Sequence, residues 1–424
     1  MAQFVIQGGA PLGGEIAVSG AKNSVLKLIA GAILLKGETK ITRVPQAQDM
    51  FRMSEILSSV GAKVESEGAV LRIHTDTIIQ TTLPRELVKR LRASTVLIGP
   101  MLARHGEVRL AYPGGCVLGK RPIDLFVASM RALGAEVEES EEEFIFRAKK
   151  LKGAEYFFPF ISVTATENMM MAATLAEGRT IIKNAACEPE IPHLAEFLNT
   201  CGARITGAGT HTIVIDGVLE LHGGEVETVP DRIETGTFAI LAAAARAQIK
   251  ITHCQPDHVE GLWAMFDRIG IPYTIGQDWI EIQKTDKPYK AVEVTTKEYP
   301  GFMTDLQPPF TVLLTQAQGM SLVHETIYDG RLFYLDKLST MGAYTLLCDP
   351  HRAVVQGPRK LHGKQLESPD LRAGIALVIA GLIAEGTTTI DNIYQIERGY
   401  ERIDERLRGL GAHIERINDT KLQE

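Results

Sequence analysis

The feature that most constrains the fold of this chain is an internal repeat. A glycine, usually followed by alanine, recurs between a helix-like and a strand-like segment, as in SVGAKVES, ALGAEVEE and GLGAHIER. Neighbouring copies are about 70 residues apart, and a second series, which includes KGETKITRV and EGTTTIDNI, has the same period out of phase. Two independent markers with one period predict six similar units. The repeated glycines are Gly61, Gly134, Gly202, Gly270, Gly342 and Gly411.

Each unit contains the same pattern of expected elements. An apolar helix, such as Lys22–Leu35 or Asp370–Ala384, precedes a short alternating strand rich in Thr, Ile and Val. A more amphipathic helix follows, as in Gln48–Val60 or Pro122–Leu133, and ends at a glycine. Two further strands joined by a tight turn complete the unit. Because the period is too long for common solenoids and propellers, we predict an α/β protein whose six units form two domains of three.

Composition limits the class of protein. The 424 residues are 45% hydrophobic and 23% charged, which is ordinary for globular domains and excludes disordered, collagen-like and disulfide-stapled chains. The net charge of −7 argues against nucleic acid as a partner, although a locally basic cleft can still hold a small anion. No segment approaches the roughly 18 apolar residues of a membrane span, and no signal peptide is recognisable, so we expect a cytoplasmic protein without membrane contacts. Five widely spaced cysteines without a CxxC pair indicate reduced thiols.

Polar residues recur with the same period near the expected helix starts. Helix N-termini carry unpaired N–H groups and partial positive charge, which favour anions. Arginine is disfavoured there by the helix dipole, so a bound anion explains it better than packing does. For Asp49, Glu190 and Asp257 we expect helix capping instead. The residues near the first helices are Lys22, Arg92, Ser162, Arg232, Asp305 and Arg372, and those near the second are Asp49, Arg121, Glu190, Asp257, Arg331 and Arg398.

The segment YPGGCVLGKRPID contains the strongest candidate nucleophile or acid. Three glycines and a proline surround Cys116, and Lys120 and Arg121 follow within five residues. Nearby cations lower the pKa of a thiol from about 8.5, so Cys116 is a candidate functional cysteine. An incidental thiol is the alternative. The residues alone support a two-domain α/β repeat protein with a cleft for a small polyanion, lined by helix starts and arginines from both domains.

Collinear motifs along the whole chain resemble the UDP-N-acetylglucosamine 1-carboxyvinyltransferase family of enolpyruvyl transferases. They are SGAKNS, RAS, PGGCVLGKRPID, EPEI, DRIETGTF, PGFMTDLQ, ETIYDGR, DLRAG and IERGYERI. The resemblance implies a two-domain inside-out α/β barrel, with 22–229 as one domain, 1–21 and 230–424 as the other, and the active site between them. It implies transfer of enolpyruvate from phosphoenolpyruvate to the 3′-hydroxyl of UDP-N-acetylglucosamine through a tetrahedral intermediate, with phosphate released. No metal or organic cofactor is expected.

The resemblance also assigns roles. Cys116 is expected to donate a proton to the methylene carbon, and Asp305 to accept the proton of the sugar hydroxyl, with Lys22 and Arg398 completing the catalytic set. The planar fork of arginine suits the phosphate and carboxylate of phosphoenolpyruvate. Expected contacts to phosphoenolpyruvate are Lys22, Arg92, Arg121 and Arg398 around the phosphate and Arg331 and Arg372 toward the carboxylate. Expected contacts to the UDP-sugar are Asn23, Arg92, Arg121, Pro122, Ile123, Asp124, Leu125, Ser162, Val163, Asp305 and Ile327.

Three positions depart from the family pattern. Phe160, Thr164 and Phe126 stand where a cation, a glycine and a polar residue are common, which affects the expected nucleotide contacts. Two alternatives remain. One is the related shikimate-3-phosphate transferase, which lacks such a cysteine loop; the other is a catalytically silent UDP-sugar-binding paralogue, which would not need an acid and a base.

Overall fold

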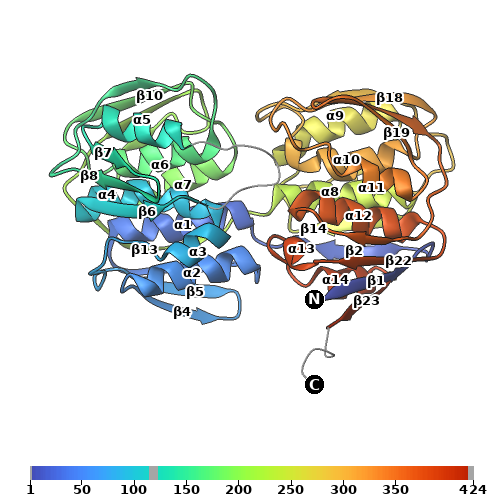
Figure 1. The fold of residues 1–424 in the computed structure, drawn as a ribbon, viewed down its shortest axis with the longest axis horizontal. Helices are drawn as coiled ribbons and strands as arrows, with labels where there is room; N and C mark the ends of the chain where they lie inside the picture. The colour runs from blue at the N-terminus through green and yellow to red at the C-terminus, as the bar shows by residue number, and fades with distance from the viewer. Residues whose placement is uncertain (1, 114–122, 419–424) are drawn as a thin grey trace. The chain divides into compact units, whose positions relative to one another are not determined.

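The computed structural model describes residues 2–113 and 123–418, which divide into two compact units. The N-terminal unit contains the described residues from Gly20 to Val229, and the C-terminal unit contains those up to Ser19 and from Pro230 onward. The chain therefore passes from one unit to the other at 19–20 and again at 229–230. In both units strands surround central helices (Figure 1).

The N-terminal unit contains three copies of the predicted pattern, followed by strand β13 (Leu221–Glu227). The first copy is α1 (Lys22–Gly31), η1 (Ala32–Leu34), β3 (Leu35–Thr42), α2 (Gln48–Ser59), β4 (Lys63–Glu67) and β5 (Val70–His74). The second is α3 (Arg85–Arg90), η2 (Arg92–Leu97), α4 (Ile98–His105), β6 (Glu107–Ala111), α5 (Asp124–Ala132), β7 (Glu136–Glu139) and β8 (Glu143–Arg147). The third is β9 (Glu155–Phe157), α6 (Val163–Ala173), β10 (Arg179–Lys183), α7 (Glu190–Thr200), β11 (Ile205–Thr206) and β12 (Thr212–Asp216).

The C-terminal unit repeats this pattern and adds two strands from the start of the chain, β1 (Gln3–Gln7) and β2 (Gly13–Ala17). Its first copy is α8 (Arg232–Ala244), β14 (Gln248–Thr252), η3 (Pro256–Val259), α9 (Glu260–Ile269), β15 (Tyr273–Ile275) and β16 (Trp279–Ile282). Its second is β17 (Glu293–Thr295), η4 (Thr304–Leu306), α10 (Gln307–Leu314), β18 (Gly319–His324), α11 (Leu335–Thr340), β19 (Tyr344–Asp349) and β20 (Arg352–Gly357). Its third is β21 (Gln365–Glu367), α12 (Leu371–Ile383), β22 (Thr387–Asp391), α13 (Tyr394–Glu397), α14 (Ile403–Gly409) and β23 (His413–Ile417).

Each copy forms one small sheet, which is mixed in five copies and antiparallel in the sheet β6-β8-β7. In the order β9-β10-β12-β11, β9 is parallel to β10 and the other two pairs are antiparallel. The sheets next to the two crossing points have the same strand arrangement, but one of their strands comes from a distant part of the sequence. β2 pairs in parallel with β14, β13 pairs in parallel with β3, and β1 lies between β22 and β23. The strands nearest the crossing points therefore complete sheets that begin far away in the sequence.

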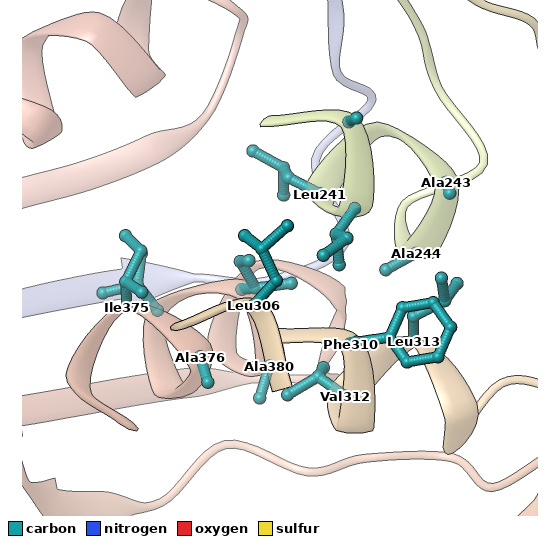
Figure 2. Packing of buried hydrophobic residues seen from close by; sticks show 14 of the residues in the cluster. Leu241, Ala243, Ala244, Leu306, Phe310, Val312, Leu313, Ile375, Ala376 and Ala380 are labelled. Carbon is teal, nitrogen blue, oxygen red and sulfur yellow. The ribbon is translucent and has the colours of Figure 1, made fainter. Parts of the chain in front are cut away.

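The first helices of the copies form the cores. Every residue of α8 and α10 is buried, as is most of α12, because these helices are apolar on all sides. Figure 2 shows Leu241 of α8, Phe310 of α10 and Ile375 of α12 in one cluster with small alanines, which let the helices pack closely. The sheets bury alternate residues against the core of their own unit, as β10 does in the N-terminal unit and β14 in the C-terminal unit. The predicted α/β class and inside-out arrangement are thereby confirmed. Among the described helices, none has the length and apolar character needed to cross a membrane.

Candidate functional site

The starts of the three core helices of the C-terminal unit meet in a cluster of charged side chains. Asp231 and Asp370 cap α8 and α12, each accepting hydrogen bonds from two backbone amides of the first turn. The turn η4 presents Asp305 at the start of α10. Arg372 Nε donates to Asp305 Oδ1 at 2.8 Å and thereby joins the starts of α12 and α10. The predicted convergence of helix starts is present in this unit.

The electrostatics of Asp305 are dominated by arginine. Burial alone would raise the pKa of Asp305, but the charges of Arg372, Arg331 and Arg232 outweigh it and hold the pKa well below its usual range. The Asp305 side chain is still 28% exposed, whereas that of Arg372 is 7% exposed. Asp305 is therefore a solvent-accessible carboxylate surrounded by cations.

Arg331 is a buried cation at the edge of this cluster. Its residue is 3% exposed, and its Nη1 lies 4.0 Å from Asp370 Oδ1. Its guanidinium lies over the ring of Tyr328, 4.9 Å from the centroid. Within the described part of the chain, its Nε and Nη1 have no hydrogen-bond partner. Buried guanidinium donors normally have acceptors, so these two are suited to an anionic ligand.

Arg398 and Ile327 lie on irregular segments of the same unit. Arg398 follows the one-turn helix α13 and donates to Gln395 Oε1 at 3.3 Å. It precedes α14 by several residues, so it is farther from the second helix of its copy than the repeat suggested. Ile327 lies between β18 and α11, where its backbone amide donates to Glu325 Oε1 at 2.8 Å.

In the N-terminal unit, Lys22 is the first residue of α1. Its Nζ lies 3.0 Å from Asp49 Oδ2, and both side chains are largely buried. The predicted capping role of Asp49 is wrong, because α2 has no side-chain cap and the carboxylate pairs with Lys22. The same expectation is wrong for Glu190 and Asp257, since α7 and η3 have no side-chain cap either. In both helices a residue before the acid occupies the cap position.

The remaining described candidates of this unit also lie near helix starts. Asn23 is the second residue of α1, and Arg92 begins the 3-10 helix η2, where we expected an α-helix. Ser162 caps α6 by accepting from the amide of Ala165 at 3.4 Å, and Val163 begins that helix. Like Lys22, all four stand within one residue of a helix start.

The sequence analysis missed a buried pair deeper in the same helices. Lys27 Nζ of α1 lies 3.2 Å from Glu167 Oε2 of α6, and the Glu167 side chain is fully buried. Burial raises the pKa of Glu167 to about 7, although Lys27 opposes the shift. A usable signal was present, since each residue stands five positions after a repeat-equivalent residue, Lys22 and Ser162.

Cys116, Arg121 and Pro122 lie outside the described residues. Of the three predicted contacts that follow, Ile123 and Leu125 are buried in the core of the N-terminal unit, and Asp124 is exposed at the start of α5.

The three departures from the family pattern differ in their surroundings. Phe126 is buried in the core of the N-terminal unit, so it acts there as a packing residue. Phe160 is 59% exposed and Thr164 is partly exposed in the first turn of α6.

Comparison with known proteins identifies the family. The model of the EPSP synthase (3-phosphoshikimate 1-carboxyvinyltransferase) family matches residues 6–407. The chain belongs to the EPSP synthase family. Two relatives are UDP-N-acetylglucosamine 1-carboxyvinyltransferase 2 of Carboxydothermus hydrogenoformans and UDP-N-acetylglucosamine 1-carboxyvinyltransferase of Halothermothrix orenii. Both are 44% identical to this chain, over 99% and 98% of it and 100% of the relative.

Solved structures of the family share the fold. The enolpyruvyl transferase NikO from Streptomyces tendae has a TM-score of 0.89 at 25% identity, covering 98% of both chains. An EPSP synthase from Acinetobacter baumannii has a TM-score of 0.78 at 20% identity, covering 99% of this chain and 100% of that one. The resemblance inferred from the motifs is confirmed at the level of family and fold.

Proposed function

We propose that this protein transfers enolpyruvate from phosphoenolpyruvate to the 3′-hydroxyl of UDP-N-acetylglucosamine and releases phosphate, a step of peptidoglycan synthesis. The observation that carries the proposal is the full-length similarity to relatives named for this activity. Two features of the described residues support it: a carboxylate surrounded by arginines in the C-terminal unit, and Lys22 and Arg92 at helix starts in the N-terminal unit. The cytoplasm is the predicted location.

In the proposed reaction, an acid protonates the methylene carbon of phosphoenolpyruvate while the sugar hydroxyl adds to the neighbouring carbon. A base takes the hydroxyl proton, giving a tetrahedral phospho-ketal. Elimination of phosphate, with loss of a proton from the newly formed methyl group, then gives the enol ether. We assign Cys116 as the acid and Asp305 as the base. Both roles are proposals, and that of Asp305 is supported by its partly exposed carboxylate at the start of α10.

The cations have a binding role in this proposal. Arg331 and Arg372 bind the carboxylate of phosphoenolpyruvate, while Lys22, Arg92, Arg121 and Arg398 bind its phosphate. The Nε and Nη1 donors of Arg331 support this assignment, because neither has a hydrogen-bond acceptor among the described residues and either can donate to an anionic ligand. The acceptor contacts proposed are Asn23, Ser162, Val163 and Ile327, with the segment from Arg121 to Leu125.

One assay with two acceptors tests the proposal. Phosphate release from phosphoenolpyruvate is measured with UDP-N-acetylglucosamine and, separately, with shikimate 3-phosphate. We expect release with the UDP-sugar alone. Release with shikimate 3-phosphate alone would favour the activity for which the family model is named. Binding of the UDP-sugar without phosphate release would indicate a catalytically silent protein.

The same assay tests the acid. Cys116→Ser should reduce phosphate release by at least about 100-fold, because serine is a far weaker acid at neutral pH. Cys348→Ser is the matched control, since Cys348 is an exposed free thiol on β19 of the C-terminal unit. Equal activity of the two variants would remove Cys116 from the proposed mechanism.

A further inference from the structure

Glu325 is a fully buried carboxylate next to the proposed base. It directly follows β18, and its residue has 0% exposure. Thr304 Oγ1 lies 3.0 Å from each of its two oxygens and donates to them. The backbone amides of Ile327 and Tyr328 donate to Oε1 at 2.8 and 3.2 Å. One side chain thus holds three donors from two separate segments.

The two segments are those that matter for the proposed acceptor chemistry. Thr304 directly precedes Asp305 in the turn η4, so a hydrogen bond to its side chain restrains that turn. Ile327 is the residue expected to contact the amino-sugar, and its amide is held by the same carboxylate. A shift of Glu325 would therefore displace the base and the sugar contact together.

Glu325 is itself fixed by the turn between β19 and β20. Its amide donates to the carbonyl of His351 at 2.7 Å, and His351 Nδ1 lies 3.0 Å from the carbonyl oxygen of Glu325. Burial raises the pKa of this carboxyl, and the charge of Arg331 opposes the shift. Placing a carboxylate in the interior costs free energy unless hydrogen bonds and a cation offset it, and both are present here.

We propose that Glu325 is a positioning residue for enolpyruvyl transfer, which fixes Asp305 through Thr304 and the acceptor loop through the amides of Ile327 and Tyr328. This inference rests on the proposed function. In this scheme Glu325 does not contact a substrate; it acts through Asp305 and Ile327, which do. A carboxylate suits the position because it only accepts hydrogen bonds and has lone pairs for all three donors.

Thr304→Val provides a test that leaves the buried carboxylate and the loop in place. Valine matches the shape of threonine but removes the hydroxyl that restrains η4. We expect kcat for phosphate release with UDP-N-acetylglucosamine to fall about 10- to 100-fold, the usual effect of a small misplacement of a catalytic group. The KM for phosphoenolpyruvate should change by less than about twofold, since its proposed ligands are untouched. Thr304→Ser should retain activity because it keeps the hydroxyl.

A double variant separates positioning from general damage. If Thr304 acts through Asp305, then Thr304→Val should cost nothing further in an Asp305→Asn background. Thr315→Val is the matched control, because Thr315 is also a buried threonine, at the other end of α10, and its hydroxyl donates to the carbonyl of Val312. Glu325→Gln should stay within a few-fold of wild type, since its oxygen can accept from both amides and its NH2 can donate to Thr304.

Three results would overturn the inference. Thr304→Val could be as active as Thr315→Val, or its loss could be undiminished in the Asp305→Asn background. Either result, obtained with an active wild-type protein and an unchanged melting temperature, removes the positioning role and leaves the proposed function intact. The third is a wild-type protein that releases no phosphate with the UDP-sugar, in which case the proposed function fails and the inference fails with it.

Discussion

Replacing Glu167 by glutamine should stabilise the N-terminal unit at alkaline pH, although it removes one partner of a buried ion pair. Glu167 is fully buried, with Lys27 at 3.2 Å. Burial raises its pKa from 4.5 to about 7, so the cost of desolvation exceeds the attraction of Lys27. A carboxyl whose pKa is higher in the folded state contributes stability below pH ~4.5, and this stability is lost as the pH rises through ~7.

The size of the effect follows from the shift. A difference of about 2.5 pKa units corresponds to about 3 kcal/mol at a pH well above 7. Neutral glutamine resembles the protonated acid, so the variant should be more stable than wild type by less than about 1 kcal/mol at pH 5. At pH 8.5 the variant should be more stable by about 3 kcal/mol. Burial lowers the pKa of His105 and His193, so their contribution to stability increases as the pH rises. This contribution is the same in wild type and in the variant, so it cancels from the difference between them.

Hydrogen exchange can follow this unit alone. Protection of the α1 and α6 amides, corrected for intrinsic exchange rates, gives the local opening free energy between pH 5 and 8.5. The two tryptophans, Trp263 and Trp279, both belong to the C-terminal unit, so their fluorescence during urea unfolding is an internal control that should not differ between the proteins. A variant less stable than wild type at pH 8.5 would refute the reasoning, because it would mean that Lys27 outweighs desolvation.

Three further predictions concern the C-terminal unit. Phe310→Ala should lower the free energy of unfolding by about 3–5 kcal/mol in tryptophan-monitored urea unfolding, because Phe310 is fully buried between core helices. The control is Phe333→Ala, at a residue that is 63% exposed, which should lower the free energy of unfolding by under about 0.5 kcal/mol. Equal losses in the two variants would contradict the assigned core. Arg406→Met should lower the free energy of unfolding by about 3 kcal/mol in the same experiment, because its ion-pair partner Glu234 is 3% exposed and would keep an uncompensated charge. The control is Arg402→Met, which removes the exposed ion pair with Glu405 and should lower the free energy of unfolding by under about 1 kcal/mol. Arg372→Lys should lower kcat/KM for phosphoenolpyruvate more than about tenfold in the phosphate-release assay, because lysine keeps the charge but loses the planar fork; an unchanged value would place Arg372 outside the proposed carboxylate site.

Local periodicity explains how much of the fold the sequence could predict. The helix expected at Asp370–Ala384 is α12 (Leu371–Ile383), and that expected at Gln48–Val60 is α2 (Gln48–Ser59). Both were predictable because their boundaries depend on nearby residues. The exchange of strands between distant parts of the chain was not predictable. For example, β13 pairs with β3, about 180 residues earlier, and nothing in the sequence of β13 itself specifies that partner.

The same division applies to the candidate site. The period predicted that helix starts would gather, and in the C-terminal unit Arg372 and Asp305 do meet. It could not predict that Asp49 pairs with Lys22, because the local preference of aspartate for helix caps points to a different role. Glu325 was missed for a similar reason: a glutamate next to a strand end is ordinary, and only its three hydrogen-bond donors show what it holds.

The ion pair between Arg372 and Asp305 limits when Asp305 can act as a base in the proposed reaction. While Arg372 Nε donates to Asp305 at 2.8 Å and other arginines surround it, their charges hold the pKa of Asp305 well below its usual range, which makes the carboxylate a weaker base. The proposed carboxylate ligand of Arg372 belongs to phosphoenolpyruvate. When that carboxylate draws Arg372 away or neutralises its charge, the pKa of Asp305 must rise. In the proposed reaction, Asp305 therefore becomes a stronger base when phosphoenolpyruvate is bound, which favours proton transfer in the complex that contains both substrates.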